Sequence, residues 1–237
     1  MKIREIIFIF MDISSRQEKI LLSLINEYIK GAQPLSSSFL VDKYKLGISS
    51  ATARNDMAEL EDLGYIFQPH TSAGRIPTEK AYRYYVKKYL LDQDNLVKTF
   101  SNLENLAFSN EEDFKKAAKV ITELSNSAVF WAFHKNDLYY TGVSNLFIQP
   151  EFKASEVLCD ISLIIDQMEE IIADVFDDIK MGETIFIGSD NPFGNFLSSI
   201  VLKYKKNGKI GVLGLLGPLR MDYEKNLNII KFLKNKL

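Results

Sequence analysis

One stretch of the chain, residues 46–78, constrains the fold more than any other: LGISSATARNDMAELEDLGYIFQPHTSAGRIPT. Ser49 or Ser50 can cap the start of a helix, because a serine oxygen accepts a hydrogen bond from the first free N–H groups. Gly64 can end that helix, since glycine readily adopts the left-handed conformation. A short strand, a small polar loop and a return strand that ends at Pro77 follow. The pattern predicts a helix followed by a β-hairpin.

The predicted helix has two different sides. At 100° per residue, Ala53, Met57 and Leu60 form one apolar stripe, which should pack inward. Arg54 and Asn55 then face away from the core in the N-terminal half. Arg suits guanine and Asn suits adenine, because each side chain can form two hydrogen bonds with that base in the major groove. The helix is therefore a candidate for reading DNA, through Ser49, Ser50, Thr52, Arg54 and Asn55.

The predicted hairpin could add contacts to the DNA backbone. Its loop, residues 69–74, combines Ser, Thr and Gly with a following Arg. Such loops bring N–H groups, hydroxyls and a guanidinium close to phosphates. Arg75 could clamp a phosphate or enter a minor groove, and the alternative is an ordinary hairpin whose side chains face solvent. The candidate contacts in this segment are His70, Thr71, Ser72 and Arg75.

Further helices are predicted on both sides of this stretch. Ser15 and Glu18 have the spacing of a capping box, which should open the first helix, and Gly31 should stop it. A serine at 36 or 37 should start a second short helix. Thr78 should cap a helix with an aromatic stripe, which more often packs in a core than stacks on bases. Three helices and a hairpin in this order are typical of a winged helix-turn-helix domain.

Charge is divided unevenly along the chain. The net charge is −2 overall, but residues 1–90 carry 13 Lys and Arg against 10 Asp and Glu, whereas residues 91–237 carry 16 against 21. The positive excess coincides with the predicted DNA-reading helix, as expected where a protein contacts phosphates. The excess is small, so affinity should depend on where the charges lie.

The rest of the chain predicts a second domain. Residues 91–111 have the pattern of a helical connector between domains at 1–90 and 112–237. Short apolar strands then alternate with helices, which predicts an α+β fold with a mixed or antiparallel sheet. One long helix is expected from Ser155 to Ile179, and another after the turn at Pro192, as far as Lys205.

Little in the sequence indicates catalysis or a cofactor. Two His and one Cys are too few for a recognisable zinc site or a Cys/His nucleophile pair. The glycines of GKIGVLGLLGP match no phosphate-binding pattern and are expected to let a buried strand approach its neighbours closely. We therefore expect no enzyme, no metal and no cofactor.

The cysteine and the N-terminus bear on location. Cys159 lies in an apolar segment and is expected to be buried. A lone cysteine suits a reducing cytoplasm. The apolar run Ile6–Met11 is too short for a membrane span. It is either an N-terminal strand or a segment that precedes a true start at Met11.

Two separate blocks of the sequence resemble one protein family. SSRQEKIL, ATARNDMAELEDLGYI and QPHTSAGRIPTEKAYRYYV, between Ser14 and Tyr85, are similar to the N-terminal domain of the heat-inducible transcription repressor HrcA. GVLGLLGPLRMDY and NLFIQPEF resemble the family's C-terminal domain, which implies a GAF-like fold for residues 112–237. The family carries an inserted dimerising domain there, where this chain has only residues 134–141. We therefore expect most of that insert to be missing.

The resemblance implies a repressor of chaperone genes. It implies a homodimer on double-stranded DNA with the inverted repeat called CIRCE, and a GroEL-type chaperonin that keeps the repressor competent. Two alternatives stay open. One is a winged-helix regulator whose GAF-like domain responds to a small molecule, and the other is a protein-docking module that has lost DNA binding.

Overall fold

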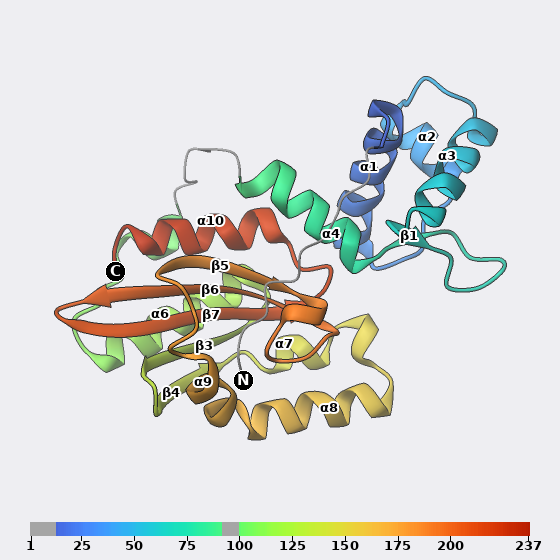
Figure 1. Ribbon diagram of the computed structural model, residues 1–237. Coiled ribbons are helices and arrows are strands. Elements are labelled where there is room, and N and C mark those ends of the chain that lie inside the picture. Colours follow the sequence, from blue (N-terminus) through green and yellow to red (C-terminus); the bar gives the residue numbers. More distant parts are fainter. Residues whose placement is uncertain (1–12, 92–99) are drawn as a thin grey trace. The chain divides into compact units, whose positions relative to one another are not determined.

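The computed structural model describes residues 13–91 and 100–237 (Figure 1). These residues belong to two compact units, one within 13–91 and the other within 100–237. The apolar run at residues 6–11 and residues 92–99 of the expected connector lie outside the described residues.

The first unit contains a bundle of short helices and a small hairpin. Its buried core includes Leu21 and Leu24 from the first helix, Leu40 from the second and Leu60 from the third. The two hairpin strands pair antiparallel, and a bridge between residues 35 and 75 extends them. The elements in chain order are α1 (Ser15–Gly31), α2 (Ser37–Tyr44), α3 (Ser50–Asp62), β1 (Ile66–Phe67), β2 (Ile76–Pro77), α4 (Glu79–Tyr85) and the π-helix η1 (Val86–Leu91).

The N-terminal helix caps of this unit are formed by the predicted types of residue, but both caps of α1 lie one residue away from the predicted positions. Its capping box joins Ser14 to Gln17, one residue before the predicted pair of Ser15 and Glu18. The prediction failed because the carboxylate of Glu18 accepts hydrogen bonds from residues 84, 88 and 89 instead. Gly31 belongs to α1, and the left-handed residue after the helix is an alanine at 32, with φ of 51°.

The second unit is built on a five-stranded antiparallel sheet with the order β4-β3-β7-β6-β5. The α+β class predicted from the sequence is confirmed. Its strands are β3 (Ala128–His134), β4 (Asp137–Thr141), β5 (Gly182–Ile187), β6 (Leu197–Lys206) and β7 (Lys209–Pro218). Its helices are α5 (Ser101–Glu104), α6 (Glu111–Ser125), α7 (Ser144–Phe147), η2 (Pro150–Phe152), α8 (Ser155–Asp166), α9 (Met168–Val175), η3 (Gly188–Asp190) and α10 (Tyr223–Lys234).

Helices cover both faces of this sheet (Figure 1). On one face, Ile161 of α8 and Ile172 of α9 share an apolar core with Phe130 of β3. On the other face, α6 and α10 contact each other and the sheet. Trp131 of β3 and Ile230 of α10 are fully buried there. Because both faces are covered, β3 and β7 are apolar at nearly every position, whereas β6 also buries Ser198, Ser199 and Lys203, each of which is hydrogen-bonded.

That double burial explains the first of three corrections. The helix expected as far as Lys205 is the strand β6, which is buried at residues 197–204 and therefore lacks the apolar and polar alternation that marks a half-buried strand. The helix expected from 155 to 179 is broken at Gln167, which lets α8 and α9 turn separate apolar faces to the core. Cys159 is exposed, because α8 buries Ile161 while Cys159 lies on its outer side.

One glycine of β7 is required by close packing. Gly214 lies opposite Phe130 in the β3–β7 ladder. A Cβ added at Gly214 would lie 2.0 Å from Cζ of the Phe130 ring, which is far inside van der Waals contact. The strand can therefore lie flat against a buried aromatic side chain only because this position has no side chain.

Candidate nucleic-acid interface

Helix α3 has the two sides that the sequence predicts. Ala53, Met57 and Leu60 are buried against the rest of the first unit. Arg54 and Asn55, in the N-terminal half of the helix, are exposed. Forming a helix does not by itself fix the direction in which Arg54 and Asn55 point. That direction depends on the contacts that hold α3 against the rest of the first unit.

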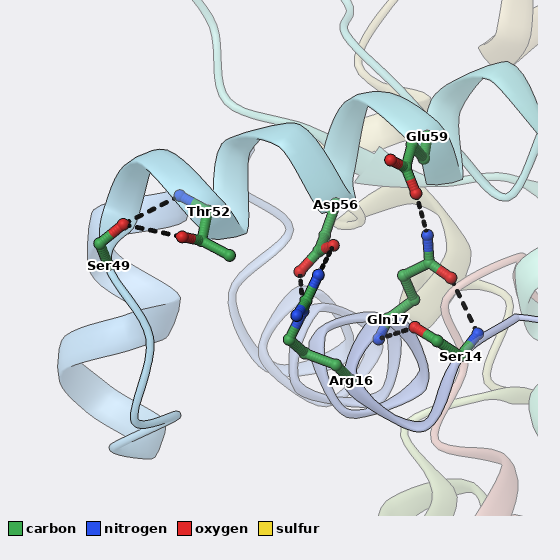
Figure 2. Close-up of polar contacts among 7 residues, drawn as sticks. All are labelled: Ser14, Arg16, Gln17, Ser49, Thr52, Asp56 and Glu59. Atoms are coloured by element: carbon green, nitrogen blue, oxygen red, sulfur yellow. Dashed lines mark hydrogen bonds and ion pairs between the residues drawn. The ribbon is translucent and has the colours of Figure 1, made fainter.

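The strongest of these contacts is an ion pair between α1 and α3 (Figure 2). Arg16 donates from Nε to Oδ2 of Asp56 at 2.7 Å and from Nη2 to Oδ1 at 2.8 Å. Asp56 is only 2% exposed. The hydrogen bonds and the nearby charge of Asp56 raise the pKa of Arg16. A paired guanidinium and carboxylate of this geometry restrict rotation as well as distance, because both bonds must form together.

A second contact links the same two helices one turn further along. Gln17 closes the capping box of α1 by accepting a hydrogen bond from the backbone N–H of Ser14 at 2.8 Å. Its Nε2 donates to Oε2 of Glu59 on α3 at 2.5 Å (Figure 2). Gln17 thus closes the cap of α1 and also contacts α3, and the rotation of α3 about its own axis is fixed at two points.

The start of α3 is closed by its own side chains. Ser49 is the N-cap and accepts a hydrogen bond from the backbone N–H of Thr52 at 3.1 Å. The hydroxyls of Ser49 and Thr52 also lie 2.9 Å apart (Figure 2). Ser49 and Ser50 are exposed, and Thr52 is half-buried. Of the predicted contacts on α3, Thr52 is therefore the least free to reorient.

The loop between β1 and β2 is shaped by a glutamine that the sequence reading did not single out. Nε2 of Gln68 donates to the backbone oxygens of Thr71 at 3.0 Å and Ala73 at 2.8 Å. The loop folds around this side chain, and Thr71, Ser72 and His70 are left exposed. These three side chains therefore project from an ordered turn.

Arg75 is placed differently from the other predicted loop residues. Its Nε donates to Oε2 of Glu61 on α3 at 2.8 Å, and its side chain is only 18% exposed. The other oxygen of Glu61 accepts from the backbone N–H of Gln68 at 2.8 Å. Glu61 therefore fixes the hairpin to the C-terminal half of α3, and Arg75 would have to leave this ion pair, or share it, to contact a phosphate.

A hollow of about 420 Å³ joins part of the predicted site. Its wall brings Arg54 of α3 together with Thr71, Ser72 and Arg75 of the hairpin and with the start of α2. Four of the nine predicted contacts thus share one depression, although they lie up to 21 positions apart in the sequence. The other five, Ser49, Ser50, Thr52, Asn55 and His70, do not line it.

The sequence held one overlooked signal for this architecture. Asp56 lies three residues after Ala53 and four before Leu60, so it falls on the apolar stripe. A carboxylate on a buried helical face requires a cationic partner. No pattern in the sequence indicated that this partner is Arg16, forty positions away.

Two other kinds of functional feature, a metal site and a membrane-spanning helix, have no candidate in the described residues. Within them, no group of three or more His, Cys, Asp or Glu side chains is placed to hold a metal ion. Nor does any helix there have the length and apolar character needed to cross a membrane.

Comparison with known proteins identifies related sequences. Residues 88–227 match the family model described as the HrcA protein C terminal domain. The chain is 28% identical to a heat-inducible transcription repressor HrcA of Thermoanaerobacter sp. (strain X514), and the match covers 96% of both chains. A repressor of the same name from Pelotomaculum thermopropionicum is 41% identical over 121 residues, or 49% of this chain and 34% of that protein.

The alignment with the Thermoanaerobacter protein is longer than this chain. It extends over 331 residues, whereas this chain has 237. The relative therefore contains many residues with no counterpart in this chain. Among solved structures, a crystal structure of a hypothetical protein at 2.2 Å resolution has a TM-score of 0.81. It is 20% identical in sequence, and the match covers 95% of this chain and 97% of that one, so it supports the fold alone.

Proposed function

The chain belongs to the HrcA family, and on that premise we propose that it is a heat-inducible transcription repressor that binds DNA. The proposal rests on one observation above all. Arg54 and Asn55 are exposed in the N-terminal half of α3, while the opposite side of the same helix is buried and held at two points by α1. A helix that is rigidly held and presents such side chains at its N-terminal half suits insertion into a major groove.

We propose that the first unit is a winged helix-turn-helix domain. In it, α3 is the recognition helix and the β1–β2 hairpin is the wing. Arg54 and Asn55 read base edges, assisted by Ser50 and Thr52, because these residue types offer the hydrogen-bonding patterns that distinguish bases. The exposed loop residues, with the N-cap at Ser49, contact the DNA backbone and set the register. His70, Thr71 and Ser72 form this second group.

Arg75 has a more specific part in this proposal. Its guanidinium is held by Glu61 beside the hollow that Arg54 also lines. A phosphate that enters the hollow offers Arg75 a second hydrogen-bond acceptor. The guanidinium group can donate to two anions at once because it has five N–H donors. Arg75 thus stiffens the hairpin in the free protein and adds a phosphate contact in the complex.

We propose that two copies of the chain bind one inverted repeat. One recognition helix reads only a few base pairs, so a symmetric dimer on a repeated site gives the specificity that a repressor requires. The family resemblance suggests that this repeat is CIRCE and that a GroEL-type chaperonin maintains the active protein. The second unit, with its antiparallel sheet and helices on both faces, would be the GAF-like domain. Since this chain lacks many residues present in its longer relative, dimer contacts must come from the residues that remain.

The experiment compares three labelled duplexes: the full CIRCE-type repeat, a single half-site and a scrambled sequence. Binding is measured by fluorescence anisotropy over a series of salt concentrations, with and without chaperonin. Arg54→Ala is compared with Arg54→Lys, which keeps the charge but loses the two-point contact with guanine. Lys19→Ala removes an exposed charge from α1 and is the control for charge alone.

We expect the full repeat to bind most tightly, with an affinity that falls steeply as salt rises. Both Arg54 variants should lose discrimination between the repeat and the scrambled duplex, at a cost of about 1–3 kcal/mol per site, while Lys19→Ala retains it. Equal and weak binding to all three duplexes, unchanged by chaperonin, would contradict the proposal and favour a protein-docking module.

A further inference from the structure

A second hollow, of about 590 Å³, lies entirely within the second unit. Three segments form its wall: the start of α6 with the residues before it, the end of the β3–β4 hairpin, and the end of the β6–β7 hairpin. It is separate from the residues that we assign to DNA. Its size falls in the range of small-molecule sites.

One side of this hollow is an aromatic cluster. Phe114 lies at its centre, with ring centroids 5.6 Å from Phe108, 5.6 Å from Phe133 and 5.0 Å from Trp131. All three of these contacts with Phe114 are edge-to-face. Rings in this arrangement form a rigid apolar wall, and such a wall favours a flat aromatic group over a flexible chain.

A hydrogen-bond donor is available beside the aromatic wall. The indole Nε1–H of Trp131 donates to Oη of Tyr204 at 2.7 Å, so this oxygen acts as the acceptor. Tyr204 is 8% exposed and lines the hollow, and in the described part of the chain its own O–H has no acceptor. Burial raises the pKa of Tyr204, so the hydroxyl keeps its proton. Gly211 makes room for this hydroxyl, because a Cβ there would lie 2.5 Å from the same oxygen.

Two cations, Lys206 and Lys209, line the hollow. Lys206 and Lys209 face each other across the β6–β7 hairpin, an arrangement of like charges that weakens a sheet. Lys206 donates to the backbone oxygen of Lys236 at 2.8 Å, and Lys209 has no ion-pair partner among residues 13–91 and 100–237. Two acids, Glu111 and Asp137, line the same hollow. Glu111 is paired with Lys115, and Oδ2 of Asp137 lies 3.7 Å from Nε2 of His134. An anion beside the two lysines would offset their repulsion.

We propose that this hollow binds a small aromatic anion. The ring lies against Phe114 and its aromatic neighbours. The anionic group accepts a hydrogen bond from Tyr204 and lies near the ammonium groups of Lys206 and Lys209. A carboxylate suits this position, because a charged acceptor strengthens hydrogen bonds from both donor types.

The structure contains its own reporter for the test. Trp131 is the only tryptophan of the chain, and its ring contacts Phe108, Phe114 and Tyr204 in the wall of the hollow. The full-length protein is titrated with biphenyl-4-carboxylate while Trp131 fluorescence is recorded. The neutral amide of the same compound is the matched probe, since it has the same rings and no charge.

We expect a saturable change in fluorescence, with the carboxylate bound at least about tenfold more tightly than the amide. Lys209→Gln should weaken the carboxylate several-fold and leave the amide unchanged. Lys119→Gln, at an exposed position of α6 outside the hollow, should change neither. Both variants alter exposed side chains, and circular dichroism verifies that each remains folded.

Three results would overturn the proposal. The first is a Trp131 signal that does not saturate with either probe. The second is equal affinity for carboxylate and amide, which would make the hollow an apolar surface without anion recognition. The third is carboxylate affinity that Lys209→Gln and Lys119→Gln reduce to the same extent, which would reflect net charge alone.

Discussion

Arg16 holds Asp56 through two parallel hydrogen bonds, of 2.7 and 2.8 Å, between the first and third helices. Asp56 points to the buried side of α3, and Arg54, two positions earlier, is exposed. The same short helix therefore carries one charged residue that anchors it and another that is available to a partner. Fixing Asp56 fixes the direction of Arg54, because a helix turns as a rigid body over so short a distance.

Removing the anchor should destabilise the first unit. In Arg16→Met the carboxylate of Asp56 stays buried and loses both donors, and an unpaired buried polar group costs about 1–3 kcal/mol. We expect a lower midpoint of urea unfolding by circular dichroism. The second unit, followed by Trp131 fluorescence, should be unaffected. Lys19→Met, which removes an exposed cation from the same helix, is the control, and an equal loss in both variants would contradict the role of the pair.

Releasing Arg75 should change the salt dependence of DNA binding. Glu61→Gln removes the carboxylate that accepts from Arg75, so that in the complex the whole guanidinium charge acts on the phosphate that Arg75 otherwise shares with Glu61. We expect the slope of log Kobs against log salt to become steeper by about one unit. Asp62→Asn removes the same charge from the adjacent, exposed position. If both variants change the slope equally, Arg75 has no special part.

Acid should weaken the contact between α1 and the α4–η1 segment. Burial acts to raise the pKa of Glu18, but hydrogen bonds from Lys88, Tyr84 and Tyr89 outweigh it, so the pKa lies below its ordinary value of 4.5. A carboxyl group with a lowered pKa stabilises the folded state above the unfolded value, and this contribution is lost as pH falls through the folded value.

The stability of the first unit should therefore decline as pH falls below about 4.5, and Glu18→Gln should remove part of that decline. Urea midpoints from circular dichroism, taken at intervals of pH, provide the measurement. Asp42→Asn, which alters an exposed carboxylate of α2, is the control. A pH dependence that is the same in Glu18→Gln and the parent chain would show that this carboxylate is not responsible.

Gly214 should tolerate no side chain. In Gly214→Ala the new methyl group would overlap the ring of Phe130, which is buried and cannot move aside. We expect a loss of about 1–3 kcal/mol, typical of overpacking in a core, measured by urea unfolding with Trp131 fluorescence. Gly217→Ala in the same strand is the matched control. Its methyl group would meet the flexible end of Met221 at 3.1 Å, so the loss should be smaller.

Local signals in the sequence were sufficient for part of the first unit. The cap at Ser49 and the buried side of α3 follow from hydrogen bonding and helical periodicity within a few residues. The same reasoning misplaced the capping box of α1 by one position, because Ser14 and Ser15 offer the same chemistry. The choice was made by Glu18, whose partners lie about seventy positions away.

Long-range packing decided the features that the sequence could not supply. The segment of β6 mixes apolar residues with Ser and Lys without a two-residue alternation, and its pairing with β5 and β7 on either side makes it a strand. Cys159 lies in an apolar segment, yet it is exposed because it lies on the outer side of α8, away from the buried Ile161. The ion pair of Arg16 with Asp56 and the hollow between α3 and the hairpin likewise join positions distant in sequence.

The sheet order has a consequence for biosynthesis. Strand β3 has β4 on one side and β7 on the other, and β7 ends at residue 218. A ribosome that has just released β3 must add more than seventy further residues before that second neighbour exists. The helices and the hairpin of the first unit pack on one another within residues 13–91, so this unit can fold early on the nascent chain. Between the folding of the first unit and the synthesis of β7, the apolar strand β3 lacks one of its two neighbours. The nascent chain most needs protection from aggregation during that interval.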